Sequence, residues 1–155
     1  MFRILNIAIT VANKFQPKHK VNYHAIIGRE RSLLQHHYGF LKCEVQSGIL
    51  YCYGEYQPTE YSITYKYRVK YDPVSAPKVT VKYPVIEYND DIHIYPKSNS
   101  LCLYHKSDLV WSIDCNLYNT IIPWTHEWFV FYELYKISGI WEHPFVSHKN
   151  GEKIE

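Results

Sequence analysis

The chain has 155 residues and a formal net charge of +2, and its length suits one domain over residues 1–155. Hydrophobic residues make up 46% of it and charged residues 21%, as in an ordinary globular protein, and no stretch approaches the roughly 18 apolar residues of a membrane span. The near-neutral charge argues against a nucleic-acid binder that works through a basic face, so we expect neither a membrane nor a nucleic acid as a partner.

The start of the chain and its cysteines bear on the cellular compartment. The apolar run over residues 1–12 is broken by Asn6 and Thr10, and no clear cleavage site follows, so it does not read as a signal peptide. The four cysteines include no CxxC pair, which gives no support to a zinc ribbon. Cys43 and Cys52 could face each other across a hairpin, but we expect a cytoplasmic protein, in which they stay thiols.

The first predicted elements are a helix and a hairpin. Apolar residues at helical spacing predict a helix over residues 29–38, with Gly39 at its C-cap. Two apolar runs, 40–46 and 49–56, flank Ser47-Gly48 and predict a β-hairpin.

Two further strands follow the hairpin. Residues 61–71 alternate without a fault between apolar and polar side chains, which predicts a strand that Asp72-Pro73 turns. Residues 78–83 alternate in the same way and end at Pro84. Together with the hairpin, these runs predict an antiparallel meander of four strands.

The pattern changes after Pro84. Residues 86–122 show little periodicity, and a long irregular region inside a compact domain is usually functional. From Pro123 to Ile137 no helix breaker appears, and Ser138-Gly139 then ends the predicted helix. The predicted fold class is therefore α+β.

The irregular region contains the candidate reactive residue, Cys102, within the apolar run Leu101-Cys102-Leu103-Tyr104. A metal site is the first alternative to consider for the histidines and cysteines. His36 and His37 are adjacent and cannot share one helix face, while His143 and His148 lie near the end of the chain. We therefore expect no metal and no other cofactor.

Two kinds of cysteine chemistry then compete. A hydrolase would pair Cys102 with a base such as His93, His105 or His148, but it usually places its nucleophile at a helix N-terminus. An acyl-carrier thiol would instead hold an acyl group as a thioester and pass it to an amine. That chemistry needs an accessible thiolate and a group that stabilises the oxyanion, without a strong base beside the cysteine. The irregular, partly apolar loop around Cys102 fits the carrier best.

The order of the elements resembles the ubiquitin-conjugating-enzyme fold: an N-terminal helix, a four-stranded antiparallel meander, a long active-site loop with one cysteine, and a C-terminal helix. Residues 93–104 are similar to that family's segment from its His-Pro-Asn tripeptide to the active-site cysteine, and Trp111 matches the tryptophan that follows. Over about residues 33–148 the chain more closely resembles a bacterial branch found in short type II CBASS anti-phage operons (cyclic-oligonucleotide-based signalling). The similar motifs are Gly54-Glu55-Tyr56-Gln57-Pro58-Thr59, Pro77-Lys78-Val79-Thr80-Val81, His93 with Leu101-Cys102-Leu103-Tyr104, Thr120-Ile121-Ile122-Pro123-Trp124, Glu127-Trp128, Tyr132-Glu133, Gly139-Ile140-Trp141 and His148.

The resemblance implies a ubiquitin-conjugating-like transferase. Cys102 would carry the C-terminus of a cGAS-like cyclic-nucleotide synthase, a nucleotidyltransferase, as a thioester and promote its conjugation, which primes anti-phage signalling. An adenylation domain does not fit in 155 residues, so activation would come from a separate activating enzyme or from the substrate. The alternative is a non-catalytic scaffold on the same fold that binds the synthase without forming a thioester.

One departure from the family's pattern concerns the oxyanion. Where that family has His-Pro-Asn, this chain has His93-Ile94-Tyr95-Pro96, so the expected asparagine is missing. We nominate His93 as the catalytic partner of Cys102. Asn99, His105 and Asp108 are the further groups that could hold the oxyanion or orient the acceptor.

Overall fold

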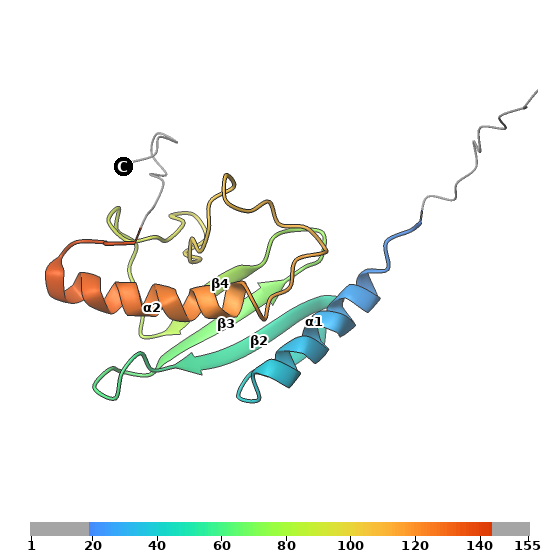
Figure 1. The fold of residues 1–155 in the computed structure, drawn as a ribbon, viewed down its shortest axis with the longest axis horizontal. Helices are drawn as coiled ribbons and strands as arrows, with labels where there is room; N and C mark the ends of the chain where they lie inside the picture. The colour runs from blue at the N-terminus through green and yellow to red at the C-terminus, as the bar shows by residue number, and fades with distance from the viewer. Residues whose placement is uncertain (1–18, 144–155) are drawn as a thin grey trace, which may run out of the picture.

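The computed structural model describes residues 19–143, which form two helices and one sheet (Figure 1). The elements in chain order are α1 (Tyr23–His37), β1 (Lys42–Gln46), β2 (Ile49–Tyr56), β3 (Tyr65–Tyr71), β4 (Lys78–Tyr83) and α2 (Ile121–Ser138). The strands lie in the order β1-β2-β3-β4 and every neighbouring pair is antiparallel. The predicted α+β class and the four-stranded meander are confirmed. Neither helix in this range has the length and apolarity needed to cross a membrane.

Helix α1 begins earlier than the sequence predicted. The side chain of Asn22 accepts a hydrogen bond from the N–H of Ala25 over 3.1 Å, so this residue caps the helix and extends it to Tyr23. The prediction that Gly39 forms the C-cap is wrong. Tyr38 is the C-cap instead, because its backbone leaves the helical region with φ −133° and ψ 82°. Its hydroxyl donates to the carbonyl oxygen of Tyr118 over 2.7 Å.

The buried carboxylate of Glu30 ties α1 to the segment that leads into α2. It accepts a hydrogen bond from the N–H of Leu117 over 2.8 Å and pairs with Arg29 over 3.0 Å. A buried carboxylate is tolerated only when such partners replace water. The contact therefore fixes where the chain enters α2.

The hairpin of β1 and β2 has the predicted turn. Ser47 and Gly48 both have positive φ angles, 51° and 76°, as a two-residue turn between twisted strands requires. The resulting register places Cys43 opposite Cys52, as expected, and both are free thiols.

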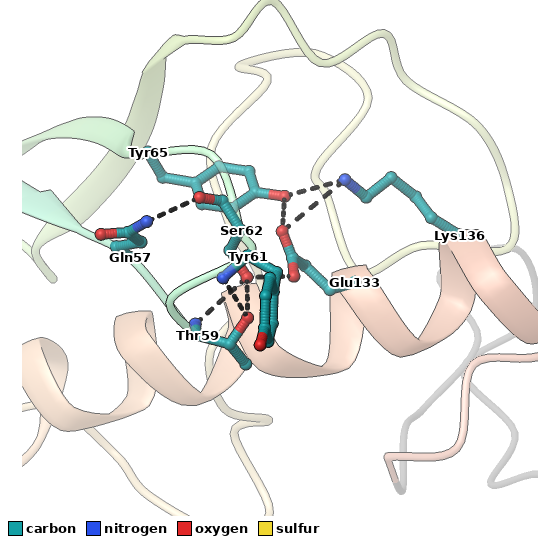
Figure 2. A network of polar contacts seen from close by, with 7 residues as sticks. All are labelled: Gln57, Thr59, Tyr61, Ser62, Tyr65, Glu133 and Lys136. Atoms are coloured by element: carbon teal, nitrogen blue, oxygen red, sulfur yellow. Dashed lines mark hydrogen bonds and ion pairs between the residues drawn. The ribbon is translucent and has the colours of Figure 1, made fainter.

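The third strand is shorter than predicted, because residues 61–64 do not join the sheet. Tyr61 is 90% exposed, and Ser62 is held by α2 rather than by a neighbouring strand. Figure 2 shows the carboxylate of Glu133 accepting hydrogen bonds from the hydroxyls of Ser62, over 2.5 Å, and Tyr65, over 2.9 Å. Lys136 donates to the Tyr65 hydroxyl over 3.1 Å. This network fastens the β2–β3 connection to α2.

Helix α2 lies across one face of the sheet (Figure 1). It begins two residues before Pro123, so the proline still stands in the first turn, where its missing N–H costs no helical bond. Phe129 stacks on Tyr65 with ring centroids 4.4 Å apart, and Trp128 is also buried. Gly139 ends the helix with φ 73°, as predicted.

Candidate functional site

The segment before Cys102 folds back on itself in a tight turn. Ile94 and Leu101 form an isolated antiparallel bridge, and the N–H of Tyr95 donates to the carbonyl oxygen of Ser100 over 2.9 Å. Asn99 adopts a φ of 51°, which asparagine tolerates better than most residues, and its N–H donates to the carbonyl oxygen of Tyr95 over 2.8 Å. The region predicted to be irregular thus contains a short hairpin-like turn, which places Cys102 opposite His93.

This turn is fastened to β4 and to α2. The N–H of Leu101 donates to the carbonyl oxygen of Val79 over 2.8 Å, and Ser100 forms a bridge with Thr80. The indole N–H of Trp128 donates to the carbonyl oxygen of His93 over 3.0 Å. Cys102 is therefore held between the edge of the sheet and the helix that covers it.

The thiol of Cys102 is buried, with a relative exposure of 5%. Its Sγ lies 3.4 Å from the hydroxyl oxygen of Tyr95 and 3.8 Å from the carbonyl oxygen of Tyr104. Burial raises the pKa of the thiol above its ordinary value, and the hydrogen bonds to Tyr95 and Tyr104 only oppose that effect. Carrier chemistry needs an accessible thiolate, whereas here the thiol is covered and its burial favours the protonated form.

The structure adds to the site one residue, Tyr95, that the sequence motifs do not single out. Across an antiparallel pair, a residue faces its direct partner and also the diagonal neighbour two positions along. Because Cys102 lies opposite His93, Tyr95 is that diagonal neighbour, and its side chain reaches Sγ. Burial, followed by the contact with Cys102, raises the pKa of the phenol, so its hydroxyl keeps its proton at neutral pH.

The signal that could have revealed Tyr95 was present in the sequence. Pro96-Lys97-Ser98-Asn99 is a run of turn-forming and polar residues between Ile94-Tyr95 and Ser100-Leu101. If this run forms a turn, the residues on its two sides pair, and Tyr95 then lies next to the cysteine.

His93 touches Cys102 through the backbone. The N–H of Cys102 donates to the His93 carbonyl oxygen over 2.9 Å, while the imidazole ring of His93 stacks on Trp141 with centroids 5.7 Å apart. The backbone of His93 thus helps to fix the position of Cys102.

The side chains of the other proposed site residues, Asn99, His105 and Asp108, form hydrogen bonds with groups other than Cys102. The side-chain amide of Asn99 donates to the carbonyl oxygen of Ile86 over 3.4 Å. His105 and Asp108 occupy a turn in which the Ser107 hydroxyl lies 2.9 Å from His105 Nδ1 and 3.3 Å from Asp108 Oδ1. Among the described residues, no hydrogen bond joins these three side chains to Cys102.

Other chemistries have less support from the geometry. Over residues 19–143, no group of three or more His, Cys, Asp or Glu side chains is arranged to hold a metal ion. Cys102 does not stand at a helix N-terminus, where a hydrolase would gain a lowered thiol pKa. His148, one of the candidate bases, lies outside the described residues.

Comparison with known proteins places these observations in a family. A family model described as "Type II CBASS E2 protein" matches residues 30–149. No curated protein matches the chain.

Proposed function

This chain belongs to the family of type II CBASS E2 proteins, and from that premise we propose that Cys102 carries the C-terminus of a cGAS-like cyclic-nucleotide synthase as a thioester. The observation that supports this role most directly is the placement of its thiol. The turn that carries Cys102 is fastened to the edge of the sheet, and Trp128 holds the cysteine indirectly through the His93 carbonyl oxygen. The Tyr95 hydroxyl and the Tyr104 carbonyl oxygen lie at its sulfur. Such a rigid, polar setting suits a group that must be presented repeatedly in one geometry.

The proposed cycle has two acyl transfers. The Cys102 thiol gives up its proton to water, and its sulfur attacks the carbonyl carbon of an activated C-terminus, either a thioester on another protein or an acyl adenylate. The new C–S bond forms, and the thiolate or nucleotide leaves with the bonding electrons. An amine then attacks the thioester, the C–N bond replaces the C–S bond, and the amine proton passes through water to the released thiolate. Conjugation of the synthase would prime anti-phage signalling.

The activated C-terminus must come from elsewhere in the system. A separate activating enzyme, or a substrate that arrives already activated, supplies it in this scheme. We place the reaction in the cytoplasm, where the cysteines of the described residues, all free, would remain reduced.

Intact-mass analysis after co-expression with the neighbouring operon proteins tests the thioester. The expected species has the mass of this chain plus that of the synthase minus one water, and hydroxylamine or excess thiol removes it. Cys102→Ala should abolish it, and Cys115→Ala, which changes a half-buried cysteine whose Sγ lies 3.8 Å from the Ser112 hydroxyl, should leave it intact. An adduct that survives in Cys102→Ala would overturn the proposal.

One observation favours a second candidate, a non-catalytic scaffold: the thiol is only 5% exposed. Cys102→Ser separates the two functions, because an oxyester is less reactive than a thioester and accumulates. A carrier predicts an adduct in this variant that excess thiol does not remove. A scaffold predicts that the synthase binds to the wild-type and serine chains alike, with no covalent species in either.

A further inference from the structure

The only side-chain hydroxyl recorded at the sulfur of Cys102 within the described residues belongs to Tyr95, 3.4 Å away. We propose that this hydroxyl is the donor that stabilises the oxyanion formed during acyl transfer at Cys102. The proposal rests on the proposed function, since it assigns a catalytic role within the same site.

The place where negative charge develops follows from the chemistry. When an amine attacks a thioester on Cys102, the electron pair of the C=O bond moves to the oxygen, which is separated from the sulfur by a single carbon atom. A donor that already lies against the sulfur is therefore close to the position of the oxyanion. Preorganised donors of this kind need no rearrangement during the reaction and stabilise the transition state strongly.

The protonation state of Tyr95 fits a donor. In the resting site the Cys102 thiol donates to the phenol oxygen, and after acylation the sulfur has no proton left to give. The phenol proton can then point toward the acyl oxygen. It donates a hydrogen bond without losing the proton, and collapse of the intermediate releases the thiolate and the new amide.

The position of Tyr95 also fits a group that can follow the acyl oxygen. Its side chain is 39% exposed, whereas the sulfur beneath it is buried. A partly exposed ring leaves room beside it for an incoming carbonyl group. The backbone of Tyr95 is held by two hydrogen bonds, to Ser100 and Asn99, so the ring is presented from a rigid base.

The nominated alternatives are directed elsewhere. The Asn99 amide donates to Ile86, and His105 is engaged with Ser107. His93 reaches the cysteine through its carbonyl oxygen, which is an acceptor and would repel an oxyanion.

Single-turnover transfer tests this role. The full chain, carrying Cys43→Ser and Cys115→Ser so that the two half-buried thiols are removed, is loaded at Cys102 with a synthetic peptide thioester, each variant to the same extent. Free lysine is then added as the acceptor. Tyr95→Phe keeps the ring and removes the hydroxyl, so transfer should slow by about 100-fold, the effect typical of losing one oxyanion donor. Tyr61→Phe, which removes a hydroxyl from a residue that is 90% exposed in the β2–β3 connection, should transfer at the wild-type rate.

A second readout separates a catalytic hydroxyl from a structural one. Tyr95→Phe should also shift the pH profile of iodoacetamide labelling at Cys102 to higher pH, because the thiolate loses a donor, while the melting temperature stays close to that of the wild type. A variant that transfers as fast as the wild type would overturn the role of Tyr95 and leave the thioester function standing. A wild-type chain that cannot be loaded at all would overturn the thioester function, and the role of Tyr95 with it.

Discussion

The backbone N–H of Cys102 donates to the carbonyl oxygen of His93 over 2.9 Å. The indole N–H of Trp128 donates to the same oxygen over 3.0 Å, so one carbonyl group connects the cysteine to α2. The position of the thiol thus depends on a helix residue that is far from it in the sequence.

Trp128→Phe tests that dependence. The change removes a donor to a part-buried carbonyl and some ring volume, and we expect the free energy of unfolding to fall by about 1–3 kcal/mol in urea titrations. Trp141→Phe is the matched control, because its buried indole nitrogen has no hydrogen-bond partner among the described residues. Equal losses in the two variants would show that the hydrogen bond to His93 adds nothing.

Thiol labelling should distinguish Cys43 from Cys102. A hydrogen bond from the Cys52 thiol, followed by the charge of Arg31, lowers the pKa of Cys43, which is also half-buried rather than covered. At pH 7.5 we therefore expect iodoacetamide to label Cys43 at least about 10-fold faster than Cys102, measured by peptide mapping over time. In denaturant the two rates should converge. Preferential labelling of Cys102 in the folded chain would contradict the burial of its thiol.

His126 should make stability fall in mildly acidic solution. Burial among Tyr56, Tyr67 and Phe40 lowers the pKa of the imidazole to about 4. An unfolded chain binds the proton near pH 6.5, so between about 6.5 and 4 the unfolded state holds more protons and stability decreases as the pH falls. Because the ring is partly exposed, we expect a loss of about 1–2 kcal/mol rather than the full value of the shift.

Urea unfolding at pH 7 and pH 4.5 measures this loss. His126→Gln keeps a polar group next to the Tyr67 hydroxyl but cannot titrate, so the difference between the two pH values should shrink by the amount that His126 contributes. If the glutamine variant loses as much stability on acidification as the wild type, another group is responsible.

Glu133 should stabilise the fold more than an exposed acid on the same helix. Its carboxylate accepts hydrogen bonds from Ser62 and Tyr65, and Glu133→Ala leaves the hydroxyl of Ser62 without this partner (Figure 2). We expect a loss of about 1–3 kcal/mol in the free energy of unfolding. Glu127→Ala, which removes an exposed pair with His143, should cost less than about 1 kcal/mol. The network would be irrelevant to stability if both variants unfolded at the same urea concentration.

The sequence predicted the regular elements well because each has a local signature. Alternation identified β4 with the observed bounds, and the Ser47-Gly48 turn fixed the register of the first hairpin. Alternation failed at residues 61–64, because Glu133, 71 residues from Ser62, competes for that segment. The cap at Asn22 was missed because a single side-chain hydrogen bond decides it.

The candidate site was predicted less completely. The position of Cys102 in a long connection was clear, but the burial of its thiol depends on how that connection packs onto β4 and α2. Tyr95 stands where the chain departs from the family's motif, and its contact with the sulfur follows from a turn that periodicity does not reveal.

The attachment of Ser100 and Leu101 to β4 has a consequence for self-association. β4 is the last strand of the sheet, and an open strand edge is a template on which another chain can pair and aggregate. Leu101 and Ser100 use part of that edge, at Val79 and Thr80. The segment that presents the cysteine thus also shields the sheet, and substitutions that release it would lower solubility as well as reactivity.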